Sequence, residues 1–339
     1  MIDRTLPLLD LHRHLDGSIR LETILDLGRK YDIPLPAEDL VGLKPFVQIT
    51  GTSPGVLAFF EKFEYMIGVL ADYEACSRVA YENVEDAYLE GIDYIELRFS
   101  PNFMSKPHHL DPAGVVEAII EGTERARRNF DIKVNLIGIL SRTYGPDQCW
   151  KELESLLPYK DQLVALDLAG DEVNYPGTLF IDHFKEGRAA GWHITIHAGE
   201  EGGPDNIWQA VEELGAERIG HGVSAAQDPH LMTYLADKGL GVESNLTSNI
   251  QTRIIEDYSK HPLKSFLEAG MVATINTDDP GISDIDLKYE YEIAAPAAGL
   301  SDGQIQTAQK NALEVAFISD EAKVELKEKA LLRSEEIDE

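Results

Sequence analysis

Short aliphatic and β-branched runs alternate along the chain with stretches whose apolar residues recur at helical spacing. The first kind predicts eight β-strands, which end near His12, Phe99, Ile139, Leu168, His197, Gly220, Ser244 and Asn276. The second kind predicts helices that include residues 112–128, 179–190, 207–214, 229–238 and 262–269. A glycine follows four of these helices where a left-handed C-terminal cap is expected, at Gly191, Gly215, Gly239 and Gly270.

The alternation of strand and helix predicts a parallel sheet, because parallel strands need crossover connections. Eight such strands predict a (β/α)8 TIM barrel, although the pattern alone also fits an open, doubly wound sheet. We expect residues 1–339 to form a single domain. It carries a helical insertion after the first strand, over 17–91, and extra C-terminal helices from residue 286 onward.

One face of the insertion is strongly apolar. Val56, Phe59, Phe60 and Phe63 recur at helical spacing. This pattern predicts either ordinary core packing or an apolar lid over the mouth of the barrel, since long loops there commonly cover an active site.

Composition narrows the class of protein. With 43% hydrophobic and 27% charged residues, the chain has the composition of a soluble globular protein. No apolar run is long enough to span a bilayer, and the N-terminus lacks the pattern of a signal peptide. The only cysteines, Cys76 and Cys149, have no partner motif, which excludes a disulfide scaffold and fits a reducing compartment. We therefore expect a cytoplasmic protein without a membrane partner, present as a monomer or a weak homo-oligomer.

The net charge of -30 argues against a nucleic-acid partner, because such a surface repels phosphate backbones. By the same argument, any nucleotide-like substrate should be small and uncharged.

Ionisable side chains gather at the ends of the predicted strands, where barrel active sites form. His12 and His14 end the first strand and point to the same side, because side chains alternate along a strand. His197 ends the fifth strand, His221 the sixth, and Asp278 follows the eighth. Burying such groups is costly unless they are paired or bound to a metal, so several at once indicate a shared centre.

Three histidines and an aspartate suit a divalent metal ion. We predict His12, His14, His197 and Asp278 as its ligands, with zinc favoured and iron, cobalt or manganese as competitors. A further position would remain for a water molecule with a lowered pKa. The remaining groups at the strand ends are predicted to do acid–base chemistry: Glu200, His221 and Asp279.

Other ionisable residues have simpler explanations. His193 shares the inward face with His197 but lies deeper, which predicts a hydrogen-bonded core histidine. We assign no catalytic role to His183, His230 or His261, which lie in or beside helices.

Five motifs occur in a fixed order from the first strand to the last. They are His-x-His-Leu-Asp-Gly at 12–17, Leu-Ala-Gly-Asp-Glu at 168–172, His-Ala-Gly-Glu at 197–200, Gly-His-Gly at 220–222 and Thr-Ile-Asn-Thr-Asp-Asp-Pro at 274–280. In this order they resemble the motifs of the bacterial adenosine deaminases, in the metal-dependent amidohydrolase superfamily. The resemblance covers essentially the whole chain. It implies a barrel with one zinc ion and the hydrolytic deamination of adenosine and 2′-deoxyadenosine to inosine and ammonia, in purine salvage.

The resemblance also implies a role for each motif residue. The four predicted ligands match the family's zinc ligands, and His14 also borders the substrate. Glu200 matches the acid that protonates purine N1, and His221 the group that orients the attacking water. The residues that match groups bound to the substrate are Asp16 for the ribose 5′-hydroxyl, the Gly170 backbone for N3 and Asp279 for N7.

Three alternatives stay open at this point. An adenine deaminase or an adenine-nucleotide deaminase would share the same motifs, although Asp16 favours a substrate with ribose. A different barrel metallohydrolase could act on an amide or a phosphoester. A nucleoside-binding protein with a vestigial site would lack a ligand or the general acid, and this sequence has both.

Overall fold

The computed structural model describes residues 1–49 and 56–338. Eight parallel strands form one sheet in simple chain order. They are β1 (Leu9–His14), β2 (Tyr94–Phe99), β3 (Lys133–Ser141), β4 (Leu163–Ala169), β5 (His193–Ala198), β6 (Arg218–His221), β7 (Gly241–Ser244) and β8 (Val272–Ile275). Each predicted strand end lies within two residues of the observed one.

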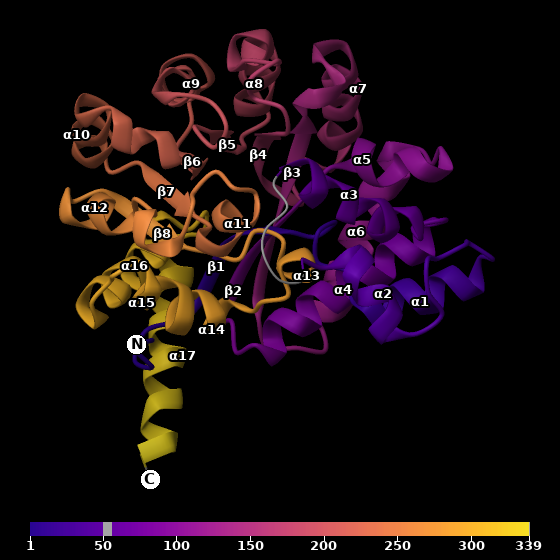
Figure 1. The fold of residues 1–339 in the computed structure, drawn as a ribbon, viewed down its shortest axis with the longest axis horizontal. Helices are drawn as coiled ribbons and strands as arrows, with labels where there is room; N and C mark the ends of the chain where they lie inside the picture. The colour runs from indigo at the N-terminus through magenta and orange to yellow at the C-terminus, as the bar shows by residue number, and fades with distance from the viewer. Residues whose placement is uncertain (50–55, 339) are drawn as a thin grey trace.

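The ends of this sheet meet just beyond β8. Asp278 forms a parallel bridge with Arg13 of β1, in which its N–H donates to the His12 carbonyl (2.8 Å) and its carbonyl accepts from the His14 N–H (2.7 Å). The prediction of a (β/α)8 TIM barrel is therefore confirmed, and Figure 1 shows the ring of helices around the strands. An open, doubly wound sheet is wrong because its strand order would reverse partway across.

Amphipathic helices cover the outside of the barrel. The crossover helices and the helix that follows β8 are α4 (Tyr73–Leu89), α6 (Pro112–Arg127), α7 (Pro146–Leu156), α8 (Ile181–Ala189), α9 (Pro204–Gln209), α10 (Pro229–Lys238), α12 (Leu263–Glu268) and α16 (Asp302–Val315). The predicted helix over 207–214 is α9 continued by a π-helical turn, Ala210–Leu214. All four predicted capping glycines have φ between 64° and 92°, which confirms the helix ends that they mark.

The insertion after β1 is helical, as predicted. Before α4 it contains α1 (Leu21–Lys30), α2 (Leu40–Val47) and α3 (Val56–Gly68). Phe59 and Phe63 of α3 are buried, and the Phe63 ring lies 5.4 Å from the ring of Phe103. The side chains of Val56 and Phe60 lie outside the described residues. A lid movement of α3 stays a prediction.

The C-terminal extension is also helical. It begins with the short helices α14 (Leu287–Tyr289) and α15 (Ala295–Ala297). Three other short helices follow strands β2, β7 and β8: α5 (Pro101–Ser105), α11 (Leu246–Gln251) and α13 (Pro280–Ser283). The last helix, α17 (Asp320–Asp338), projects away from the barrel in Figure 1. Within the described residues, no helix combines the length and the apolar character needed to cross a membrane.

Glu290 joins this extension to the barrel. It starts the π-helical turn Glu290–Ala294, and its buried carboxyl accepts a hydrogen bond from the Thr247 N–H of α11 at 3.2 Å. Burial raises the pKa of Glu290 to about 8, so this side chain is protonated at neutral pH in the folded protein.

This pKa predicts how Glu290→Gln changes stability with pH. Between the unfolded value and about 8, the native state holds a proton that the unfolded chain has lost, so stability falls as pH rises. Glutamine cannot titrate, so the variant's unfolding free energy should fall less steeply with pH than that of the wild type between about pH 5.5 and 7.5. The two slopes should differ by at most about 1.4 kcal/mol per pH unit. Urea unfolding across this range measures both slopes. Glu292→Gln, an exposed neighbour, should keep the wild-type slope. The same slope in all three proteins would contradict this account.

Candidate metal centre and active site

Side chains from both ends of the sequence converge at the C-terminal mouth of the barrel. Nε2 of His12 and Nε2 of His14, both from β1, lie 3.2 Å and 3.3 Å from the same oxygen, Oδ1 of Asp278. Nε2 of His14 lies 3.2 Å from Nε2 of His197, on β5. The structure therefore brings the four predicted ligand side chains to one point.

The spacing of these atoms fits a divalent metal ion. In a tetrahedral site with bonds of about 2.0–2.1 Å to nitrogen and oxygen, neighbouring ligand atoms lie about 3.3 Å apart. Nε2 of His12 is buried and has no hydrogen-bond partner among the described residues, which is costly unless an ion binds it. Burial also lowers the pKa of His197 to about 4, which leaves the neutral imidazole that a metal requires.

His221 approaches this centre from another side. His12, His197, His221 and Asp278 offer donor atoms within 4.8 Å of one another, and this buried group includes His221 but not His14. Its Nε2 lies 3.8 Å from Oδ2 of Asp278 and 3.5 Å from Oε2 of Glu200. It thus faces the oxygen of Asp278 that does not contact His12 or His14.

Two buried carboxylates hold the histidine rings from behind. Oε2 of Glu243 lies 2.7 Å from Nδ1 of His12, and Oδ2 of Asp167 lies 3.0 Å from Nδ1 of His197. Such contacts fix the ring orientation and the tautomer, and they leave Nε2 of each ring free to bind an ion. Arg98 bridges the two carboxylates, at 2.8 Å from Glu243 and 2.9 Å from Asp167.

Both carboxylates carry a charge in this network. Although burial raises the pKa of Glu243, Arg98 and Arg218 hold it well below its usual range. Asp167 is likewise buried, yet His197 and Arg98 keep its pKa below its usual range. Sequence reasoning assigned no role to these carboxylates. The available signal was a charged residue inside a buried strand, which needs a partner there.

His193 does not lie where the sequence predicted. It is the first residue of β5, so it stands at the opposite end of the barrel from the metal centre. Its side chain is 47% exposed, contacts Glu217 at 2.8 Å and stacks on Phe317. The prediction of a core histidine is wrong because the strand begins there, and inward-facing periodicity does not establish depth.

The backbone bends sharply at the centre. His221 and Asp278 have φ of 63° and 64°, which is uncommon for residues with a Cβ. At Gly17 the constraint is space, because a side chain would collide with Asp279: a Cβ there would lie 1.7 Å from Oδ1 of Asp279. The glycine of the first motif thus leaves room for the second aspartate of the last.

A cavity of about 550 Å³ opens beside the metal centre. It is bordered by His14, Asp16 and Gly170, with Phe63 and Phe103 on its apolar side. Such a volume suits a small organic ligand. Oδ2 of Asp16 accepts a long hydrogen bond from the Ser100 N–H (3.3 Å), while its Oδ1 is without a hydrogen-bond partner among the described residues.

Two carboxyl groups at the centre have raised pKa values, so they can donate protons. Burial, together with the neighbouring charge of Asp278, raises the pKa of Glu200 well above its usual value. The same two causes raise the pKa of Asp279. Burial lowers the pKa of His221, which favours its neutral form. A proton donor and a neutral imidazole therefore stand side by side.

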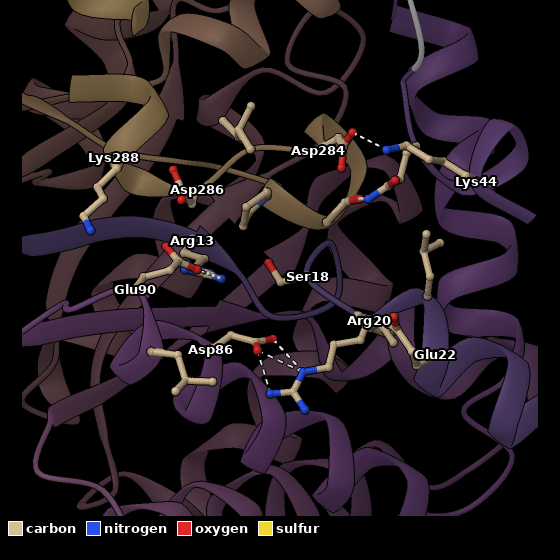
Figure 2. Close-up of a pocket in the computed structure, with 17 residues that line it drawn as sticks. Arg13, Ser18, Arg20, Glu22, Lys44, Asp86, Glu90, Asp284, Asp286 and Lys288 are labelled. Carbon is tan, nitrogen blue, oxygen red and sulfur yellow. Dashed lines mark hydrogen bonds and ion pairs between the residues drawn. The ribbon is translucent and has the colours of Figure 1, made fainter. Parts of the chain in front are cut away.

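A second cavity, of about 500 Å³, lies outside β1 and is shown in Figure 2. Arg13, between the two ligand histidines, points to this side and contacts Glu90 at 2.9 Å. Arg20 is paired with Asp86, and Lys44 with Asp284. Because this cavity lies on the other side of β1 from the histidines that converge with Asp278, it is not the candidate active site.

The carboxylates behind the ligands predict the effect of Asp167→Asn. The variant keeps the shape of the side chain but removes the charge that holds Nδ1 of His197. Affinity for the metal should fall by about 10–100-fold. Competition with a chelator measures it. Glu217→Gln is the control, since it alters the same kind of carboxylate–histidine contact on the exposed His193. Equal affinity in wild type and Asp167→Asn would contradict the role of Asp167.

Known proteins match this sequence along nearly its whole length. Residues 7–331 match the family model described as adenosine deaminase. An adenosine deaminase of Pectobacterium atrosepticum is 56% identical over 331 residues, covering 98% of each chain. One from Vibrio parahaemolyticus is 57% identical over 329 residues, covering 97% of this chain and 98% of its own.

Solved structures share the fold at lower identity. An adenine deaminase from Arthrobacter aurescens superimposes with a TM-score of 0.88 at 23% identity, covering 97% of this chain and 99% of its own. The N6-methyl-AMP deaminase of Arabidopsis thaliana gives a TM-score of 0.83 at 27% identity, covering 98% of each chain. The same fold therefore occurs in deaminases that are named for different substrates.

Proposed function

The chain belongs to the adenosine deaminase family, and we propose that it deaminates adenosine with one zinc ion held by His12, His14, His197 and Asp278. As a member it is an enzyme, and its reaction is the hydrolytic conversion of adenosine to inosine and ammonia. The observation that carries the proposed site is the convergence of these four side chains beside Glu200.

The choice of His14 over His221 as a ligand rests on distances. His12 and His14 approach the same oxygen of Asp278, at spacings that suit one tetrahedral ion. His221 faces the other oxygen, at 3.8 Å. When bound, the zinc ion lowers the pKa of a water molecule toward neutrality and so supplies the nucleophile.

Glu200 serves as the general acid. Its raised pKa keeps it protonated, so it can give a proton to purine N1 while water adds to C6. Protonation at N1 offsets the negative charge that the addition would otherwise place on the ring. One proton of the attacking water restores Glu200, and the other passes from the C6 hydroxyl to the amino nitrogen. The C6–N bond of the tetrahedral carbon then breaks, ammonia leaves and C6 becomes the carbonyl carbon of inosine.

Other residues orient the purine and the ribose. Asp279 can donate a hydrogen bond to N7, which is an acceptor, because its raised pKa keeps it protonated. The Gly170 N–H donates to N3, and Asp16 accepts from the ribose 5′-hydroxyl. His221 orients the attacking water.

The cavity favours a nucleoside over a nucleotide. Asp16, Asp171 and Glu201 contribute carboxylates to its lining, and the described lining residues include no lysine or arginine. A 5′-phosphate would meet repulsion there without a cation to bind it. Adenine without ribose would leave Asp16 without its partner. This argues against both alternatives, although relatives at lower identity include an adenine deaminase and an N6-methyl-AMP deaminase.

The cellular setting follows from composition. We propose a cytoplasmic enzyme, a monomer or a weak homo-oligomer, whose partner is the small-molecule nucleoside. Cys76 and Cys149 are buried free thiols, as a reducing compartment permits. The net charge of -30 supports the absence of a nucleic-acid partner.

A substrate panel tests this function. Purified enzyme is incubated with adenosine, 2′-deoxyadenosine, adenine and AMP, with and without a chelator, and ammonia release is measured. We expect turnover of both nucleosides, little of adenine and AMP, and loss of activity with chelator that zinc restores. Activity on AMP or adenine alone would overturn the substrate assignment.

The general acid is tested with Glu200→Gln. Glutamine fills the same space but cannot give up a proton to N1, so kcat should fall by about 10²–10⁴-fold. Zinc content and nucleoside binding should be retained, as read by metal analysis and calorimetry. Glu213→Gln, at an exposed position outside the cavity lining, is the control and should keep its activity. Near-normal turnover by Glu200→Gln would refute the role.

A further inference from the structure

His221 can act in two ways at the centre, depending on which ring nitrogen carries its proton. With the proton on Nδ1, its Nε2 would be a base that could take a proton from water. With the proton on Nε2, it can only donate a hydrogen bond at that atom. We propose that Asn249 and His261 hold His221 in the second form, as positioning residues. This inference rests on the proposed function.

A backbone amide determines which atom donates and which accepts in the hydrogen bonds that join His261, Asn249 and His221. The Leu263 N–H lies 3.2 Å from Nδ1 of His261, and an amide N–H can only donate. Nδ1 of His261 is therefore the acceptor. His261 is 4% exposed, and burial lowers its pKa to about 3, so its ring is neutral. Its one proton is therefore on Nε2.

The side-chain amide of Asn249 is oriented by this proton. Nε2 of His261 lies 3.2 Å from Oδ1 of Asn249, which accepts the proton just located. The amide nitrogen of Asn249 then faces the other way, 3.0 Å from Nδ1 of His221. Because an amide NH₂ only donates, Nδ1 of His221 accepts.

The proton of neutral His221 is therefore on Nε2, the nitrogen that faces the reacting groups. That nitrogen lies 3.5 Å from Oε2 of Glu200 and 3.8 Å from Oδ2 of Asp278. The amide nitrogen of Asn245 lies 3.3 Å and 3.4 Å from the two ring nitrogens, so it does not select between them. The contact with Asn249 is shorter and does.

The consequence is chemical. A ring nitrogen that already carries a proton has no free lone pair, so Nε2 of His221 in this form is not the base for the attacking water. It donates a hydrogen bond to the oxygen that attacks C6, and no proton moves to or from its ring. His261 stands behind this arrangement on the turn before α12 and is not among the described residues that line the cavity.

Nitrogen NMR reads the tautomer directly. Zinc-loaded enzyme labelled with ¹⁵N-histidine should show, for His221, an unprotonated Nδ1 and a protonated Nε2. A protonated Nδ1 in the wild-type enzyme would overturn the proposal. This spectrum requires no variant, so it decides the matter even if a substitution prevents folding.

Asn249→Asp reverses the contact, because a carboxylate can only accept from Nδ1. We expect the NMR signals of His221 to show a protonated Nδ1, and kcat to fall about 10²-fold with little change in KM. Asn129→Asp, which makes the same charge change at an exposed position, should alter neither. An unchanged His221 spectrum with unchanged kcat in Asn249→Asp would refute the role of Asn249.

The role of His261 is separated from simple packing by rescue. His261→Gln offers an N–H to Oδ1 of Asn249 and should keep the His221 tautomer and most of kcat, whereas His261→Ala should lose both. Equal loss in the two variants would contradict a positioning role. A wild-type enzyme that shows the expected tautomer but does not deaminate adenosine would instead reject the proposed function.

Discussion

The contact on which the site depends is the buried bridge from Arg98 to Asp167 and Glu243. One guanidinium joins the two carboxylates that hold His197 and His12, so β1, β2, β4, β5 and β7 are tied together beneath the metal centre. Buried charges are costly unless each has its partners, and removing one leaves the others uncompensated. The network therefore allows few arrangements of the rings, which is what preorganised metal binding requires.

Closure of the barrel places Asp278, the fourth proposed ligand. The backbone of Asp278 bridges to Arg13, between His12 and His14, so the contact that joins the two edges of the sheet also places the carboxylate against both histidines. The left-handed φ of Asp278 turns its side chain into the mouth. Fold and site thus share one constraint: any register shift between β8 and β1 would separate the ligands.

Much of this architecture can be predicted from the sequence. Strand ends, helix caps and the converging His12, His14, His197 and Asp278 follow from periodicity and from polar residues placed at the ends of apolar runs. The local sequence pattern does not show which residue is the partner of a buried charge. Glu243 and Asp167 look alike in sequence whether they bind a metal ligand or an arginine, and the depth of His193 depends on where its strand begins. His261 shows the same limit, because its contacts arise only when α11 and α12 are packed together.

The most direct test of the account is a crystal structure of the zinc-loaded enzyme with a bound nucleoside, in which anomalous scattering locates the ion. We expect one zinc ion bound by His12, His14, His197 and Asp278, with His221 outside its ligands and Glu200 beside purine N1. A zinc ion bound by His221 in place of His14, or a nucleoside whose N1 lies away from Glu200, would contradict it.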